Sequence, residues 1–270
     1  PVKQYKNGLI LHYSFDKDQG SQVADESGNG YNATVFGAKW APNGIAGGAY
    51  EFNGTSDYLD AGRVLPDAIP DEMTISVWVK PRELRKKEYS TIIAKNFGAG
   101  QPFGMRFTGS GLYAQISGPD RTYSHNATGD FPDNEWSHIV VTYSKAQDCG
   151  ITYSNGKVLT TSRLETMSHR PIEGSLYVGR DTRDSLCNFK GIIDDVRIYS
   201  RALTVQEVSQ LYGMLKPKSG LGDGLVLHYS FDKNQGSKVT DESGNGFTGT
   251  VVGATWDERG ASGGGYVFDG

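Results

Sequence analysis

Long apolar runs and cysteine are both scarce in this sequence of 270 residues. No apolar stretch reaches the roughly 18 residues of a membrane-spanning helix, so we expect no insertion into a membrane. The only cysteines, Cys149 and Cys187, lack histidines at the spacing of a zinc site and are compatible with one disulfide. The chain begins at Pro1 without a methionine, which indicates a mature form or an excised fragment.

Positive charge is also limited. The chain has 27 Lys and Arg against 31 Asp and Glu, which gives a net charge of −4. Its longest basic run, within Leu84-Arg-Lys-Lys87, is short and typical of a solvated loop. Because a nucleic-acid interface needs a basic patch or stripe, we expect no nucleic-acid partner.

Signatures of catalysis are missing as well. A retaining glycosidase needs two carboxyl groups about 5 Å apart, which residues i and i+2 of one strand can supply. The sequence has no Glu-x-Asp-x-Glu pattern, no phosphate-binding loop and no Ser/His/Asp order. Asp194 and Asp195 are adjacent, so on a strand they point to opposite faces. We therefore expect a protein that is not an enzyme.

One stretch occurs twice. Residues 8–54 and 224–270 align at a constant offset of 216 without a gap, and 30 of the 47 positions are identical. This offset is the period of a whole domain, because solenoid repeats run roughly 20–50 residues. We predict a complete module at 1–214, a linker at 215–223 and the truncated opening of a second module at 224–270.

The second opening is too short to close a β core and would present unpaired strand edges. One interpretation is that the chain is a piece of a longer tandem array. The alternative is strand exchange, in which the second opening docks where a first opening normally sits and links neighbouring copies.

Turns and short strands dominate the rest of the sequence, which has 36 glycines. Segments with period-two alternation recur along the first module, and Asn155-Gly156 is a strong hairpin signal between two of them. A single short helix is expected at 204–212, where Thr204 and Glu207 form a capping box. The pattern predicts an all-β, two-sheet antiparallel β-sandwich with one short C-terminal helix.

The first strand illustrates the alternation. Leu9, Leu11, Tyr13 and Phe15 are expected on one face, and His12 on the other, as a surface or hydrogen-bonded residue.

Eight ordered segments of the first module carry a family pattern. They are Leu11–Asp16, Asp25–Gly30, Phe52–Tyr58, Thr74–Lys80, Trp136–Tyr143, Tyr153–Gly156, Leu176–Gly179 and Gly191–Leu203. In this order they resemble the laminin-G-like, concanavalin-A-like jelly rolls of large secreted and surface proteins. The resemblance implies a jelly roll of two curved sheets, an extracellular location, frequent calcium, and glycan or protein binding.

Loops rich in Asp, Asn and Gly suit Ca²⁺, which takes six to eight oxygen ligands. The expected calcium ligands are Asp16, Asp25, Asn29, Asn53, Asp57, Asp194 and Asp195. The alternative is that Asp25, Asn29 and Asn53 only form turns. Asp194 shares parity with Val196 and Ile198, so we expect it to point inward and to need a metal or backbone amides as a partner.

A glycan site needs exposed aromatic rings and polar groups. The candidate ligand-binding residues are Trp78, Tyr89, Arg106, Tyr113, Arg121, Tyr123 and His125. Trp78 either faces a groove or packs under a loop or the terminal helix. Asn-x-Thr sequons at Asn32, Asn53 and Asn126 predict N-glycosylation if the source is a secretory eukaryote.

We interpret the chain as a non-catalytic, extracellular binding or adhesion module of a tandem-repeat protein that recognises glycans or extracellular proteins, with structural calcium. The alternative is a structural repeat of an extracellular filament or adhesin that assembles through its neighbouring copies. A third interpretation is an accessory domain of a polysaccharide-degrading enzyme. An exposed aromatic groove favours the first, and the near-identical repeat favours the second.

Overall fold

The computed structural model describes most of the chain in two units. The described residues are 6–64, 70–86, 88–95, 103–109, 111–117, 120–166, 174–180, 187–216, 226–243, 245–260 and 263–269. The units comprise residues 1–216 and 217–270. Most of the predicted linker, 217–223, lies outside the described residues.

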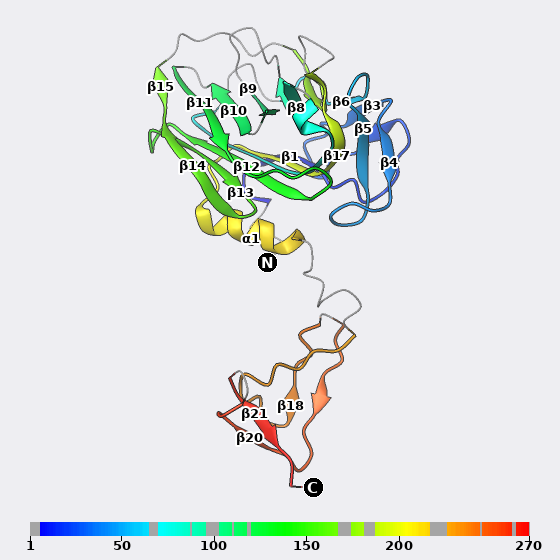
Figure 1. Ribbon diagram of the computed structural model, residues 1–270, viewed down its shortest axis with the longest axis vertical. Helices are drawn as coiled ribbons and strands as arrows, with labels where there is room; N and C mark the ends of the chain where they lie inside the picture. Colours follow the sequence, from blue (N-terminus) through cyan, green and yellow to red (C-terminus); the bar gives the residue numbers. More distant parts are fainter. Residues whose placement is uncertain are drawn as a thin grey trace. The chain divides into compact units, whose positions relative to one another are not determined.

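Unit 1 is a sandwich of two antiparallel sheets, which confirms the predicted fold class (Figure 1). Sheet A has the order β14-β13-β12-β7-β17-β5-β4, and β1 also pairs with β17. Its strands are β1 (Leu9–Tyr13), β4 (Lys39–Ala41), β5 (Ala49–Asn53), β7 (Glu72–Pro81), β12 (Ser137–Ser144), β13 (Cys149–Ser154), β14 (Lys157–Arg163) and β17 (Lys190–Tyr199).

Sheet B has the order β15-β11-β10-β9-β8-β16-β6-β3-β2. Its strands are β2 (Gln22–Val23), β3 (Ala33–Phe36), β6 (Tyr58–Asp60), β8 (Tyr89–Lys95), β9 (Phe103–Thr108), β10 (Gly111–Ser117), β11 (Arg121–Thr128), β15 (Glu165–Thr166) and β16 (Leu176–Val178). A 3-10 turn, η2 (Leu84–Lys86), follows β7. Sequence neighbours β8 to β11 are also neighbours in the sheet, whereas β16 lies between β8 and β6.

The apolar core fills the space between the two sheets. Alternate residues of β7 and β9, among them Ile75, Val77 and Met105, join one buried cluster. The first strand departs from its predicted alternation, because a bulge lies between Leu9 and Leu11. Leu11 joins the main core, but Leu9 packs against a second apolar cluster instead. The extra residue in the bulge reverses the face on which the strand begins.

The predicted hairpin is confirmed. Asn155 and Gly156 connect β13 to β14, and their φ angles are +50° and +74°. Both angles lie in the left-handed region, as a two-residue type I′ turn requires.

Unit 2 contains four short strands, β18 (Lys238–Val239), β19 (Gly249–Thr250), β20 (Thr255–Asp257) and β21 (Gly265–Val267). It repeats the local contacts of the first copy. The indole of Trp40 donates to the carbonyl of Phe15 at 2.8 Å, and Trp256 donates to Phe231 at 2.9 Å. Phe15 and Phe231 also share a left-handed backbone, with φ of 57° and 58°. Local sequence therefore sets the conformation of this segment.

The two copies differ in what covers them. Leu11 and Phe52 are 0% and 1% exposed, whereas their counterparts Leu227 and Phe268 are 44% and 75% exposed. In unit 1 these positions are buried next to β17, with which both β1 and β5 pair. The described residues of unit 2 form only two two-stranded sheets.

Helix α1 (Val205–Leu215) covers the face of sheet A that is turned away from sheet B (Figure 1). Its capping box is confirmed, since Thr204 and Glu207 cap each other's backbone N–H groups. Val208 and Leu211 are buried in a cluster with sheet A residues. No helix in the described ranges is long and apolar enough to cross a membrane.

Three rings stack beneath this helix. The ring centroid of Trp78 lies 4.8 Å from that of His138 and 5.5 Å from that of Tyr212 on the helix, and the centroids of His138 and Tyr212 are 6.1 Å apart. His138 is completely buried, with Nε2 2.9 Å from the hydroxyl of Ser76. Burial lowers the pKa of His138 to about 3. The imidazole is therefore neutral at any pH at which the protein is commonly handled.

This buried histidine predicts a pH dependence of stability. Below the unfolded pKa of about 6.5, the unfolded chain binds a proton that the folded chain does not bind until about pH 3. Between these values His138 should lower the free energy of unfolding by about 1.4 kcal/mol for each pH unit of acidification. Urea unfolding between pH 7 and pH 4 measures how the free energy of unfolding changes with pH. In His138→Gln this change should be smaller by the contribution of one proton, about 1.4 kcal/mol for each pH unit. Equal slopes in the two proteins would contradict the assignment.

Candidate functional site

The outer face of sheet B is the surface turned away from the core. Along β9, Phe103, Met105 and Phe107 enter the core, so the alternating positions Arg106 and Thr108 face outward. The same alternation on the neighbouring strands gives this face a set of aromatic and polar side chains.

A first cluster, the β9 cluster, consists of Tyr89, Arg106 and Tyr113. The guanidinium carbon of Arg106 lies 4.2 Å from the ring centroid of Tyr89 and 5.1 Å from that of Tyr113. Tyr113 of β10 is directly opposite Arg106 in the sheet. Cation–π attraction at these distances holds the guanidinium against both rings. All three are candidate ligand-binding residues on the sequence alone, and the structure brings them together.

Hydrogen bonds extend the β9 cluster along β10 and β11. The Tyr113 hydroxyl donates to Oε1 of Gln115 at 2.9 Å and lies 2.8 Å from the hydroxyl of Ser124. Gln115 in turn donates to the hydroxyl of Ser117. This row of oriented donors and acceptors beside aromatic rings suits a ligand with many hydroxyl groups.

A second cluster on the same face, the β6 cluster, consists of Phe36, Tyr58, Tyr177 and Arg180. The rings of Phe36 and Tyr58 stack with centroids 4.6 Å apart, and those of Tyr58 and Tyr177 meet edge-on at 5.7 Å. This cluster is not among the candidates predicted from the sequence, although Tyr58 and Tyr177 lie in family segments. Alternation on each strand could have placed these side chains on the outer face. Only the order of β16, β6 and β3 in the sheet, which the sequence does not reveal, brings them together.

Four other candidate ligand residues do not line an open groove. Trp78 and Tyr123 are completely buried, so neither can stack on a ligand. Burial also raises the pKa of Tyr123 to about 12. Arg121 pairs with Asp148 across the strand edge. His125 lies between the hydroxyls of two β14 residues, Thr160 and Ser162. We correct the prediction for Tyr123, because its strand alternation turns it into the core. Trp78 takes the second of its two expected positions, under the terminal helix. Arg121 and His125 stay predictions, and the partners that the structure shows for them belong to the protein.

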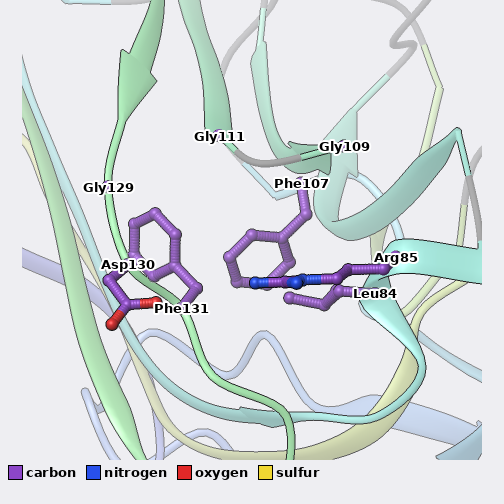
Figure 2. Close-up of a pocket in the computed structure, with 8 residues that line it drawn as sticks. All are labelled: Leu84, Arg85, Phe107, Gly109, Gly111, Gly129, Asp130 and Phe131. Atoms are coloured by element: carbon purple, nitrogen blue, oxygen red, sulfur yellow. The ribbon is translucent and has the colours of Figure 1, made fainter.

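A pocket of about 460 Å³ lies at the end of β9, β10 and β11, beside η2 (Figure 2). The rings of Phe107 and Phe131 pack edge-on at 5.1 Å, and Leu84 is buried beside them. Figure 2 shows Arg85 extending toward the rings and the carboxylate of Asp130 pointing away. Both rings are nearly covered, so this pocket offers little aromatic surface for stacking.

The first group of expected calcium ligands forms a turn. Asp25 accepts N–H bonds from His12 at 3.0 Å and Tyr31 at 3.1 Å, and also accepts from Ser27. Burial raises the pKa of Asp25, but these hydrogen bonds outweigh burial and lower it overall. The amide of Asn29 donates to carbonyls of β1. Asp25 and Asn29 therefore act as turn formers in this structure.

The second group, Asn53 and Asp57, closes the connection from β5 to β6. Oδ1 of Asn53 accepts from the N–H groups of Thr55 at 2.8 Å and Ser56 at 3.0 Å. Asp57 accepts from the N–H of Asn53 at 3.0 Å. Its other oxygen would lie 2.4 Å from a Cβ added to Gly37, so only glycine fits there.

The third group lies on β17. Asp194 is completely buried and accepts from the N–H groups of Ile45 at 2.8 Å and Ala46 at 3.4 Å. Its second oxygen accepts from the N–H of Asp195 at 2.7 Å. Burial and the neighbouring Asp195 raise the pKa of Asp194 to about 8. A metal or backbone amides were the two partners expected for Asp194, and the structure shows the backbone amides.

A bulge corrects the predicted direction of Asp194. Asp195 has a left-handed φ of 44°, and the β17–β7 register shifts between residues 194 and 197. Asp194 is therefore opposite Trp78, on the helix side, whereas Val196 and Ile198 enter the core. An inserted residue reverses strand parity, so Asp194 does not share their face.

Asp195 joins a separate network. Its Oδ1 accepts two bonds from Arg197, at 2.8 and 3.0 Å, and one from Nε2 of His12 at 2.9 Å. Burial raises the pKa of Asp195, but the Arg197 charge and the His12 bond lower it overall. Asp16 lies nearby, and its pKa is raised by burial and by the charges of Glu26 and Asp195.

Six of the seven expected calcium ligands thus make hydrogen bonds within the protein, and the Asp16 carboxylate lies among the charged groups around Asp195. In the described part of the chain, no three His, Cys, Asp or Glu side chains are placed to hold a metal ion. Because calcium needs several convergent oxygens, the residues do not fit the ion in this arrangement.

The cysteines and sequons take the following positions. No disulfide joins Cys149 and Cys187. Asn32, Asn53 and Asn126 are all exposed. Asn126 is directly opposite Tyr113, so an N-glycan there would stand beside the β9 cluster.

A laminin-G sequence profile, described as the concanavalin A-like lectin/glucanases superfamily, matches residues 53–209. The chain belongs to this superfamily. None of the curated proteins matches the sequence significantly.

Solved structures share the fold at low sequence identity. The binding domain of Paraclostridial Mosquitocidal Protein 1 is 18% identical with a TM-score of 0.61, over 77% of this chain and 52% of that one. The binding domain of botulinum neurotoxin serotype G is 19% identical with a TM-score of 0.60, over 82% and 53%. The chain therefore spans about half the length of these domains, and the likeness shows the fold alone.

The calcium prediction can be tested by thermal unfolding of the chain in CaCl₂ and in EDTA. The arrangement of the seven ligands predicts the same Tm in both, because a bound ion would have to displace hydrogen bonds already made. A calcium-dependent rise in Tm that Asp195→Asn or Asp57→Asn removes would show that these residues rearrange around the ion.

Proposed function

We propose that unit 1 is a non-catalytic binding module that holds a glycan or a protein partner on the outer face of sheet B. The observation that supports this most is the β9 cluster, where Arg106 is held between Tyr89 and Tyr113 beside a row of hydrogen-bonding groups. Half-buried aromatic rings with adjacent polar side chains suit a sugar, which has apolar ring faces and polar edges.

The module belongs, in this proposal, to a secreted or cell-surface protein and takes part in adhesion. The superfamily match covers residues 53–209 of the sandwich and is consistent with lectin-like binding. One structure with this fold is described as the receptor binding domain of a botulinum neurotoxin C/D mosaic serotype. By analogy alone, the partner of this module could also be a receptor. An accessory role beside a polysaccharide-degrading enzyme is the less favoured variant.

A second candidate role is assembly through the repeated segment, as in an extracellular filament or adhesin. It is favoured by the shared local structure of the copies and by the exposure of Leu227 and Phe268 in the second. Residues that one copy buries against β17 are available on the other, so neighbouring copies of the module are the partners in this role.

A glycan array of the whole chain tests the binding role, run with calcium and again with EDTA. We expect binding to a small group of related glycans, and Tyr113→Ala should weaken it about tenfold because a stacking ring and its hydrogen bonds are lost. Val158→Ala is the matched control, since Val158 is exposed on β14 of the other sheet.

Binding that Tyr113→Ala leaves unchanged would place the site elsewhere and overturn the proposal. A blank array in both conditions would overturn the glycan role and favour assembly. Equal circular dichroism and Tm for the variants and the parent chain would establish that any loss is not unfolding.

A further inference from the structure

Arg180 occupies a defined position at the end of β16. Its guanidinium carbon lies 4.4 Å from the ring centroid of Tyr58 and 5.1 Å from that of Tyr177. The preceding residue, Gly179, has a left-handed φ of 84°, and an added Cβ would lie 2.5 Å from the ring of Phe52. Glycine is therefore required at 179, and the tight turn directs Arg180 over the two tyrosines.

The charge of Arg180 is not neutralised by a described carboxylate. Elsewhere in the described chain five arginines pair with Asp or Glu, namely Arg82, Arg121, Arg197, Arg201 and Arg259. For Arg180, the contacts found with described residues are the two aromatic rings. Asp60 is opposite Tyr177 in the sheet, but its carboxylate accepts from the N–H of Gly62.

This arrangement leaves the hydrogen-bonding edge of the guanidinium available. Rings that hold the flat face of an arginine restrict its rotamers and leave its N–H groups to form a paired contact with two oxygens of an anion. Such a fork binds carboxylate and phosphate oxygens in paired contacts, and a sulfate group offers negatively charged oxygens in the same tetrahedral arrangement as phosphate. Because the chain as a whole carries a net charge of −4, attraction of an anion must be local to this site.

An exposed apolar surface adjoins the cation. Phe36 is 42% exposed and stacks on Tyr58 with an angle of 14° between the ring planes. A sugar ring packed on Phe36 would place a substituent toward Tyr58 and Arg180. The β6 cluster therefore combines a stacking platform with one cation, on the same face of sheet B as the β9 cluster.

We propose that Arg180 recognises an acidic group, a carboxylate or a sulfate, on the glycan that binds the outer face of sheet B. This inference rests on the proposed function and adds the ligand class, which is an acidic glycan. Strand β8, which carries Tyr89 of the β9 cluster, pairs with β16, which carries Tyr177 of the β6 cluster, so one oligosaccharide that crosses these two strands could contact both clusters.

Calorimetry of the whole chain with matched oligosaccharides tests the inference. One pair is a hexamer of galacturonic acid and the same hexamer with its carboxyl groups reduced to alcohols. The other pair is a sulfated dextran oligosaccharide and the unsulfated form. We expect at least one acidic member to bind about tenfold more tightly than its neutral twin, as a charge-assisted contact would produce. The pair that shows the preference identifies carboxylate or sulfate.

Two arginine variants assign the preference. Arg180→Gln should remove it and leave the neutral twin's affinity within about twofold, because only a charge-assisted contact is lost. Arg163→Gln has the same change of charge on β14 of sheet A and should keep the preference. An Arg180→Gln protein that still prefers the acidic member would overturn the inference. Equal binding of the acidic and neutral twins by the wild-type protein would also overturn the inference. If that binding is still weakened by Tyr113→Ala, the proposed function stands. No binding of any of these oligosaccharides would overturn the inference, whereas the glycan role of the proposed function is overturned only by a blank glycan array.

Discussion

Two adjacent buried carboxylates on β17 hold β1 and the turn before β5 in place within sheet A, at the point where β17 changes partners. Strand β5 pairs with residues 190–193 of β17, and β1 pairs with residues 196–199. Between them Asp194 binds the backbone of the turn that precedes β5, and Asp195 binds His12 of β1. The bulge at Asp195 lets the side chains of Asp194 and Asp195 reach different partners. Without these hydrogen bonds, burial of either carboxylate would cost considerable free energy.

The same constraint determines where the β6 cluster lies. Strand β5 leads through the turn at 53–57 into β6 of the other sheet, and Asp57 closes that turn on the N–H of Asn53. Gly37, which contacts Asp57, follows directly after Phe36. The anchored β5 therefore fixes Tyr58 through a tight turn, and the approach of Gly37 to Asp57 fixes Phe36 beside it. Sites on strands held this way keep their geometry without a ligand, which reduces the ordering cost of binding.

Local signals predicted much of the fold, and long-range pairing limited the prediction of the site. The hairpin at Asn155-Gly156 depends only on backbone angles that those two residues favour, so the sequence was sufficient. The bulge at Asp195 depends on two partner strands, and alternation alone placed Asp194 on the incorrect face. The β9 cluster was accessible because β8, β9 and β10 are consecutive, whereas Tyr58 and Tyr177 meet only through a strand order that crosses the sequence.

The most direct test of the central claim, that ligands bind the outer face of sheet B, is tyrosine footprinting. The chain would be nitrated with and without the tightest-binding oligosaccharide, and each tyrosine quantified by peptide mass spectrometry. The account predicts that ligand protects Tyr89, Tyr113 and Tyr58, while Tyr212 under the opposite sheet reacts equally in both samples. Unchanged nitration of the first three, with protection elsewhere, would contradict it.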